Sequence, residues 1–195
     1  MSDLSSSYWN NRYVNDDFAW DLGAVSTPLK AYIDQLTNKE LNILIPGAGN
    51  AYEAEYLYSR GFKNVYVLDF ALAPLLNIKA RIPEFKESHL LNQDFFEHSG
   101  QYDLILEQTF FCALNPALRK RYVAHMLELL KPGAKLTGVL FNDVLNKDQP
   151  PFGGSKAEYE TLFFPDFHPL KMELCYNSIK PREGRELFIM LQKPA

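Results

Sequence analysis

The feature that most constrains the fold is a regular alternation, from residue 41 onward, between short apolar runs and longer amphipathic segments. The short runs are rich in β-branched and aromatic residues and end at turn residues, which is typical of buried strands. The predicted strands are Leu41–Ile45, Val65–Asp69, His89–Gln93, Tyr102–Glu107, Ala134–Phe141, Pro169–Ser178 and Arg185–Gln192. The predicted helices are Ala51–Ser59, Leu72–Arg81 and a third that opens at Asn115-Pro116 and ends before Lys131-Pro132-Gly133.

Strands that alternate with helices pair in parallel through right-handed crossovers, so the pattern predicts a doubly wound α/β sheet. The last connection, Ile179–Gly184, is too short for a crossover helix, and we therefore expect the last two strands to form an antiparallel hairpin. A chain of 195 residues suits one hydrophobic core, and no linker or repeat divides it. We predict a single domain, residues 1–195, with a mostly parallel seven-stranded sheet.

A glycine loop, Pro46-Gly47-Ala48-Gly49, connects the first predicted strand to its helix. Ligands of open α/β sheets bind at the carboxyl ends of the strands, where glycines let the backbone approach them. Asp69 ends the second strand, where its carboxylate can accept hydrogen bonds from ribose hydroxyls. A tight turn and an acid at a helix start would explain each feature alone, but together they favour a nucleoside site. Tyr52 stands where the dinucleotide fingerprint needs a small residue, which disfavours NAD.

Composition excludes several other classes of function. The net charge is −4, and the one dense basic run, Arg119-Lys120-Arg121, is typical of a solvated helix face, so we expect no nucleic-acid partner. The amino terminus does not have the layout of a signal peptide and no apolar stretch is long enough to span a membrane, so we expect a cytoplasmic protein. No metal site is expected, because the cysteines and histidines form no ligand spacing; these residues are Cys112, Cys175, His89, His98, His125 and His168.

Several motifs together carry a family resemblance. Three segments resemble the corresponding parts of one protein family. The segment that resembles its glycine loop is Ile45-Pro46-Gly47-Ala48-Gly49, the one that resembles its ribose-binding strand end is Leu68-Asp69-Phe70-Ala71, and the one that resembles its adenine segment is Gln93-Asp94-Phe95-Phe96. The most specific motif is Phe110-Phe111-Cys112-Ala113-Leu114-Asn115-Pro116, joined by Tyr8-Trp9-Asn10-Asn11-Arg12-Tyr13, Trp20-Asp21 and Pro150-Pro151-Phe152. On these motifs the chain resembles the thiopurine S-methyltransferase family, in particular its halide/thiol methyltransferase branch. Ala51 and Gln149 depart from the family pattern, each replacing a glycine.

The resemblance implies a Rossmann-like class I methyltransferase fold, with S-adenosyl-L-methionine as cofactor and a small molecule as substrate. The cofactor-binding residues that it implies are Trp9, Trp20, Pro46, Gly47, Gly49, Asp69, Asp94, Phe95 and Glu107. The substrate-binding residues that it implies are Trp20, Phe110 and Phe152. We expect a monomer or a weak homodimer.

Two of these assignments have a simpler alternative. Glu107 would pair with the amino group of the cofactor's methionine part, or it would be a strand-end acid that faces solvent. Trp9 and Trp20 would belong to a lid over the active site, formed by residues 1–25, or they would only anchor the terminal segment to the core. In the lid, their rings could attract the sulfonium through a cation–π contact.

Transfer of a methyl group to a thiol or a halide needs few catalytic groups from the protein. Methyl transfer from a sulfonium is an in-line displacement that needs alignment and exclusion of water, while the cofactor carries the chemistry. A thiol can react as its thiolate and a halide needs no base, so we predict no catalytic side chain. An O- or N-methyltransferase would need a base, with Glu107, Tyr159 and His168 as the candidates. A third alternative is a non-catalytic module that only binds the cofactor.

Overall fold

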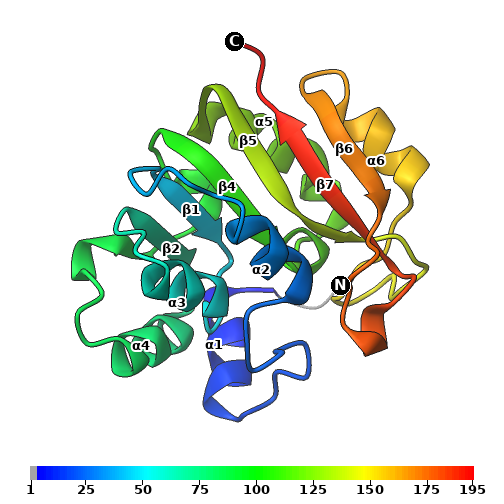
Figure 1. Ribbon diagram of the computed structural model, residues 1–195. Coiled ribbons are helices and arrows are strands. Elements are labelled where there is room, and N and C mark those ends of the chain that lie inside the picture. Colours follow the sequence, from blue (N-terminus) through cyan, green and yellow to red (C-terminus); the bar gives the residue numbers. More distant parts are fainter. Residues whose placement is uncertain (1–3) are drawn as a thin grey trace.

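The computed structural model describes residues 4–195, and their centre is a seven-stranded sheet with helices on both faces (Figure 1). The strand order is β3-β2-β1-β4-β5-β7-β6. The first five strands in this order are parallel, whereas β7 runs antiparallel to both β5 and β6. The strands are β1 (Ile43–Pro46), β2 (Val65–Asp69), β3 (Leu90–Asn92), β4 (Tyr102–Gln108), β5 (Leu130–Phe141), β6 (His168–Leu174) and β7 (Glu186–Gln192). The predicted doubly wound sheet with its terminal hairpin is confirmed.

Six α-helices and five short 3₁₀ turns connect and cover the strands in the described chain. The α-helices are α1 (Ser6–Val14), α2 (Thr27–Ile33), α3 (Tyr52–Ser59), α4 (Leu72–Arg81), α5 (Arg119–Leu129) and α6 (Lys156–Phe163). The 3₁₀ turns are η1 (Glu87–His89), η2 (Phe95–Glu97), η3 (Phe111–Ala113), η4 (Pro116–Leu118) and η5 (Lys180–Arg182). In residues 4–195 no helix has both the length and the apolar character that crossing a membrane requires.

Two hydrophobic cores lie on opposite faces of the sheet, because successive strand residues point to opposite sides. On β1, Ile43 and Ile45 pack with the buried residues of α2, α3 and α4, while Leu44 between them packs on the other face. That other face holds the buried side of α5, including Tyr122, together with α6. The segments after β1 and β4 therefore cover opposite faces, which opens a crevice at the carboxyl ends of these neighbouring strands.

The structure corrects several predicted boundaries. β1 begins at Ile43 and not at Leu41, and the predicted helix at Asn115 begins instead as the turn η4, whose first N–H groups Asn115 caps. β5 already begins at Leu130, so the Lys-Pro-Gly stretch belongs to the strand. Its pairing with β4 is irregular there, shifting register between Tyr102 and Leu104. The sequence did not predict this part of the strand, because proline and glycine are unfavourable inside strands. Pairing within the sheet stabilises it.

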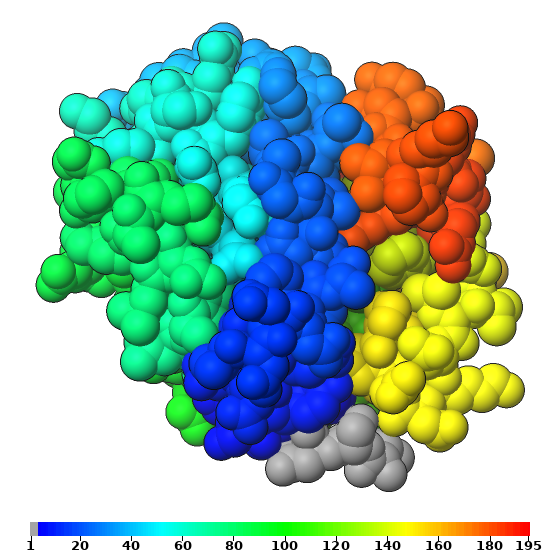
Figure 2. All heavy atoms as spheres, turned by 90° about the horizontal axis from the view of Figure 1, so that it is seen from below, coloured from blue at the N-terminus to red at the C-terminus, as the bar shows by residue number. Residues whose placement is uncertain are grey.

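The amino-terminal segment lies across the carboxyl end of the sheet. Figure 2 shows this segment in dark blue between the green surface that follows α4 and the yellow loop of residues 142–155. The lid predicted over residues 1–25 starts outside the described residues, since residues 1–3 are not among them. From residue 4 onward the segment contains α1, the turn at Trp20 and the approach to α2.

Candidate active site

The glycine loop turns sharply between β1 and α3. Gly47, Gly49 and Ala51 all have left-handed backbone conformations, with φ of 56°, 51° and 56°. A methyl group on Gly47 would lie 2.1 Å from Cδ2 of Phe110, and one on Gly49 would lie 2.5 Å from the hydroxyl of Tyr13. Both glycines are therefore required by close approach as well as by backbone conformation. Pro46 is the last residue of β1 and lines neither the main cavity described below nor the small one beside the glycine loop.

Asp69 lies at the carboxyl end of β2 and faces this loop. Its Oδ2 accepts a hydrogen bond from Gly49 N at 3.1 Å, and its Oδ1 accepts one from Ala71 N at 2.9 Å. Burial raises the pKa of Asp69 to about 6, and the two N–H donors oppose that shift. Each oxygen keeps a second lone pair, and the residue lines the main cavity. The carboxylate can therefore accept hydrogen bonds from a ligand.

The main cavity has a volume of about 610 Å³ and runs along the carboxyl ends of the strands. Five of the residues that the sequence analysis assigned to the site line it from the sheet side: Gly47, Asp69, Asp94, Phe95 and Phe110. Asp94 caps η2 by accepting a hydrogen bond from Phe96 N at 2.7 Å. The ring of Phe95 is buried at 4% exposure and stands edge-on to that of Phe110, with 5.1 Å between centroids.

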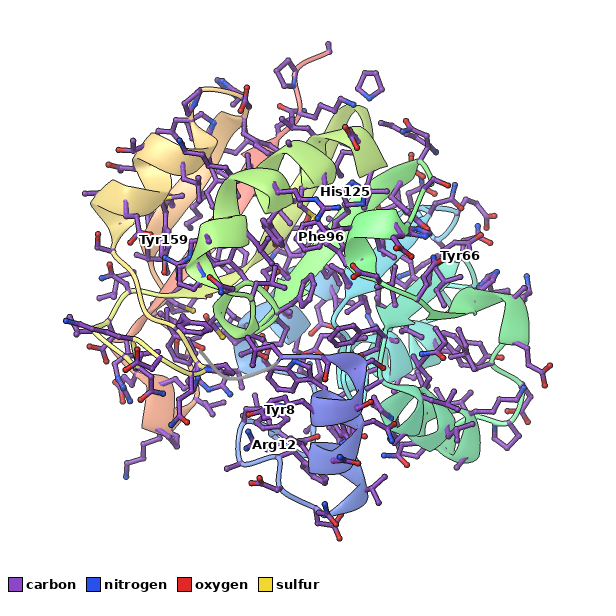
Figure 3. The ribbon with its side chains drawn as sticks, turned by 180° about the vertical axis from the view of Figure 1, so that it is seen from behind. Tyr8, Arg12, Tyr66, Phe96, His125 and Tyr159 are labelled. Atoms are coloured by element: carbon purple, nitrogen blue, oxygen red, sulfur yellow. The ribbon has the colours of Figure 1, made fainter. Side chains whose placement is uncertain are left out.

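The amino-terminal segment closes the same cavity with aromatic rings. Trp9 and Trp20 both line it, and their rings meet edge to face at 5.5 Å. The segment is attached to the start of α4, because Ser6 Oγ donates to Phe70 O at 2.6 Å and Asn10 Oδ1 accepts from Ala73 N at 3.0 Å. Figure 3 shows Tyr8 and Arg12 on one side of α1.

Glu107 lies elsewhere than predicted. It is completely buried at 0% exposure and lines neither cavity. Its Oε1 accepts from Phe110 N at 2.8 Å and Phe111 N at 2.9 Å, and its Oε2 accepts from Tyr122 Oη at 2.6 Å. Burial raises its pKa to about 7. Glu107 is thus neither solvent-facing nor turned toward the cavity; it holds the turn that presents Phe110.

The Pro-Pro-Phe loop also differs in detail from the prediction. Pro150 and Pro151 line the main cavity, but Phe152 is buried at 3% exposure and does not. The backbone N–H of Phe152 donates to Cys112 O at 2.7 Å, so this loop is attached to the turn after β4. Phe152 positions the two prolines rather than lining the cavity itself.

Four arginines and a tyrosine to which the sequence analysis gave no role in the site also line the main cavity: Arg12, Arg121, Arg182, Arg185 and Tyr13. The basic run predicted as a solvated helix face is therefore only partly so, because Arg121 lines the cavity and Arg119 is buried in an ion pair with Glu158.

Arg182 is buried, donates to Trp20 O at 2.8 Å and lies 3.4 Å from Oε1 of the buried Glu186. Arg185 pairs with Asp143 at 2.5 Å. Arg12 and Tyr13 belong to a motif that the sequence analysis quoted. Arg182 and Arg185, in the β6–β7 connection, belong to no recognisable sequence pattern.

The distribution of charge along the cavity is uneven. Asp69 ends β2 and Asp94 follows β3, on one side of the crevice. There, Arg121 of α5 lies over the ring of Phe96 at 4.4 Å from its centroid. Arg182 and Arg185 belong to the β6–β7 connection on the other side, near Phe141, Leu145 and the two prolines. Of the described histidines, none lines the cavity, and residues 4–195 contain no cluster of three or more His, Cys, Asp or Glu arranged for a metal ion.

Comparison with known proteins agrees with this arrangement. The sequence model of the family described as Thiopurine S-methyltransferase (TPMT) matches residues 4–188. "Probable thiol methyltransferase 2" of Arabidopsis thaliana is 29% identical over 192 residues, covering 95% of this chain and 84% of that protein. "Thiocyanate methyltransferase 1" of Brassica oleracea is 26% identical over 184 residues (91% and 81%), and bovine thiopurine S-methyltransferase is 28% identical over 187 residues (82% and 76%).

Solved structures show the same fold at low sequence identity. The 1,6-didemethyltoxoflavin-N1-methyltransferase of Burkholderia thailandensis, solved with S-adenosylhomocysteine, has a TM-score of 0.79 at 17% identity, covering 98% of this chain and 88% of that one. The magnesium protoporphyrin IX methyltransferase of Synechocystis, solved with S-adenosylmethionine, has a TM-score of 0.73 at 11% identity (99% and 98%). The family match spans nearly the whole chain, and we conclude that the protein belongs to the thiopurine S-methyltransferase family, enzymes whose methyl donor is S-adenosylmethionine.

Proposed function

We propose that the protein methylates a small thiol or a related sulfur compound, which it takes up as an anion, with halides as a further substrate class. The observation that carries this proposal is the composition of the cavity wall opposite Asp69. There, Arg182 and Arg185 lie among apolar side chains and prolines, with no histidine from the described chain. Each of these guanidinium groups is paired with one carboxylate, and its remaining N–H groups can donate hydrogen bonds to an anion in a wall where no histidine of residues 4–195 can accept a proton. The named activities of the thiol and thiocyanate methyltransferases among the relatives support the same class.

The residues present fit S-adenosylmethionine on three grounds. Gly47 of the glycine loop lines the main cavity, that cavity of about 610 Å³ is of ligand size, and Asp69 is a buried acid with free lone pairs. Asp69 would hold the ribose hydroxyls, Asp94 and Phe95 would flank the adenine, and Trp9 and Trp20 would cover the sulfonium end. When bound, S-adenosylmethionine supplies an electrophilic methyl group on a positively charged sulfur.

The protein's own part is to hold the nucleophile as an anion and to exclude water. Arg182 is fixed by Trp20 O and Glu186, and Arg185 by Asp143, so both guanidinium groups are held in place before a substrate arrives. Preorganised guanidinium N–H donors stabilise a thiolate more than a thiol, which replaces the need for a base. Cys112 is not a competing nucleophile, because burial raises the pKa of its thiol to about 12.

The main alternative, an O- or N-methyltransferase, lacks a positioned base. The carboxylate of Glu107 accepts hydrogen bonds from three protein groups and does not line the cavity. Tyr159 donates its hydroxyl proton to Phe141 O, and burial raises its pKa. His168 lies exposed on β6. None of the three candidate bases lines the cavity, which favours a nucleophile that arrives already ionised.

Several further expectations belong to this proposal. We propose that residues 1–195 act as one domain, that residues 1–25 form a lid, and that the enzyme is a cytoplasmic monomer or weak homodimer. The attachment of α1 to α4 and of Trp20 to Arg182 supports the lid. The free state of both buried cysteines, Cys112 and Cys175, agrees with a reducing compartment.

The direct test is a turnover assay with a panel of nucleophiles. We expect methyl transfer from S-adenosylmethionine to small thiols and to thiocyanate, weaker transfer to iodide, and none to alcohols or amines of the same size. Arg182→Met should abolish most of the thiol activity while cofactor binding persists. Turnover confined to alcohols or amines would reject the proposal, and cofactor binding without any turnover would favour the non-catalytic module.

A further inference from the structure

The strand β6 forms one edge of the sheet, on the far side of β7 from the rest (Figure 1). An edge strand has a row of backbone N–H and C=O groups that can pair with another extended chain. β6 is seven residues long, whereas β3 at the opposite edge has only three. Of the two edges that the sheet of residues 4–195 presents, β6 therefore offers the longer stretch for pairing.

Apolar side chains are exposed at this edge. Leu170 is 42% exposed, Leu174 is 57% exposed, and Tyr176, two residues after the strand, is 86% exposed. They are three of the seven large apolar side chains that are exposed in the described chain, although they come from one short stretch of sequence. A cluster of this kind is typical of a surface that another molecule covers.

The pairing of β6 with β7 determines which backbone groups face outward. Cys175 N donates to Glu186 O, next to β7, at 2.8 Å. Along an antiparallel strand, successive residues direct their N–H and C=O groups alternately to one side and to the other. By this alternation, Met172 and Leu174 direct their backbone groups to the open side of β6.

The open side of β6 is complementary to itself. Residues 170–174 alternate in the order apolar, basic, apolar, acidic, apolar: Leu170-Lys171-Met172-Glu173-Leu174. Antiparallel pairing with a second copy about a two-fold axis at Met172 places Lys171 opposite Glu173 of the second copy. The same register places Leu170 opposite Leu174 of the second copy, and it lets the two Met172 residues exchange backbone hydrogen bonds.

The two charged side chains are accessible for such a contact. Lys171 and Glu173 lie on the same face of β6, two residues apart, with 3.5 Å between Nζ and Oε2. Their side chains are 38% and 67% exposed. Each can therefore pair with the opposite charge of a second copy, which gives two ion pairs in the two-fold register and none in a register shifted by one residue.

We propose that two copies of the chain associate through β6, antiparallel and in the register centred on Met172, so that their sheets become one continuous sheet. A two-fold contact of this kind uses the β6 edge of both copies and leaves only the short β3 edges free, so assembly stops at the dimer. The paired stretch is short, and we expect the dimer to dissociate on dilution. The inference concerns assembly and does not rest on the proposed methyl transfer.

The proposed dimer keeps the two active sites apart. β6 leads at its carboxyl end into the connection that carries Arg182 and Arg185, both of which line the main cavity. Because the two β6 strands run in opposite directions, their carboxyl ends point away from each other. The two cavities then lie at opposite ends of the continuous sheet, and neither copy covers the active site of the other.

Charge reversals at the two exposed positions test both the association and its register. Lys171→Glu and Glu173→Lys each place like charges opposite one another, so sedimentation velocity should show each variant as a monomer at concentrations where the wild type is a dimer. One variant then carries two acids at these positions and the other two bases. An equimolar mixture of the two variants should therefore form heterodimers.

Lys86→Glu is the matched control, because it makes the same change of charge at an exposed position before β3, at the opposite edge of the sheet, and should remain dimeric. The double variant Lys171→Glu/Glu173→Lys should dimerise by itself, which keeps the test decisive if one single variant fails to fold. A wild type that is monomeric at several hundred micromolar would overturn the proposal. Dimers that persist in both single variants would overturn it as well.

Discussion

At the scale of single residues, Asp69 shows how one carboxyl serves both the loop and a ligand. Its carboxylate accepts hydrogen bonds from Gly49 N and Ala71 N, which fix its orientation. Burial raises its pKa to about 6. The carboxylate accepts hydrogen bonds and the neutral acid accepts them poorly, so cofactor affinity depends on its ionisation.

We therefore expect Asp69→Asn to weaken S-adenosylhomocysteine binding by about ten- to a hundredfold, since a charge-assisted hydrogen bond is worth about 1.5–3 kcal/mol. The wild-type affinity should be flat above about pH 7 and should fall as the pH drops below about 6. The variant should lose that dependence. Calorimetry at several pH values measures both effects, and a folded variant with wild-type affinity would contradict the role of Asp69.

Glu107 is a second buried acid, and it acts on stability. Burial raises its pKa in the folded state to about 7, so the fold favours its neutral form. Its contribution to stability is present at low pH and is lost as the pH rises from the unfolded pKa toward about 7. From 1.36 kcal/mol per pKa unit, we expect Glu107 to contribute a fall of up to about 3 kcal/mol in the unfolding free energy over this interval. Asp69, whose pKa is raised to about 6, adds a further fall that is complete near pH 6.

Urea denaturation between pH 5 and 8 measures this decline. Glu107→Gln should remove the decline between about pH 6 and 7, because the amide does not titrate, and should leave the decline that Asp69 causes below about pH 6. Glu84→Gln changes an exposed acid and is the control that should retain the wild-type slope. A Glu107→Gln protein with an undiminished slope would show that another group causes the pH dependence.

At the scale of elements, local sequence signals explain most of what could be predicted. The strands, the helices α3 and α4 and the terminal hairpin follow from periodicity and turn residues, and they were confirmed within a few residues. The start of β5 at Leu130 could not be predicted, because the Lys-Pro-Gly stretch indicates a turn and only pairing with β4 makes it a strand. The helix α6 lies in a segment whose short pattern gave no signal.

The sequence could predict the positions of those site residues that local backbone geometry determines. The left-handed glycines and Asp69 belong to a local loop and a strand end, so their spacing is visible in the sequence. The inward direction of Arg182 and the burial of Phe152 depend on contacts with Trp20 and Cys112, which are distant in sequence. Glu107 could be placed at the end of its strand, but its orientation toward Tyr122 could not.

The lid is an element whose closure can be tested directly. Ser6 and Asn10 attach α1 to the start of α4 by hydrogen bonds, and Tyr13 is buried against Trp20. S-adenosylhomocysteine should bury Trp9 and Trp20 further, and we expect it to slow proteolytic cleavage within residues 4–25 by at least fivefold. 5′-Methylthioadenosine, which lacks the amino-acid part of the ligand, should protect less. Equal cleavage rates with and without ligand would favour a passive anchor.

At the scale of the whole molecule, the two sides of the crevice have different tasks. We propose that the side of β2 and β3 holds the nucleoside through its acids and aromatic rings, whereas the side of β5 and β7 presents Arg182 and Arg185 among apolar groups. The sheet order places these sides on either side of β1 and β4. The central claim is that the nucleophile enters this crevice already ionised.

The measurement that tests this claim most directly is kcat/KM from about pH 6 to 9.5 with two thiols whose pKa values differ by about two units. If the enzyme takes the thiolate, the rate rises with pH up to the pKa of each substrate, near 8.5 for an ordinary alkyl thiol. The groups of the enzyme, including Asp69 and Glu107, are common to both profiles, so any displacement between them belongs to the substrates. We predict inflections that differ by about the difference in substrate pKa. An inflection at one pH for both thiols would contradict the account and indicate a base on the enzyme.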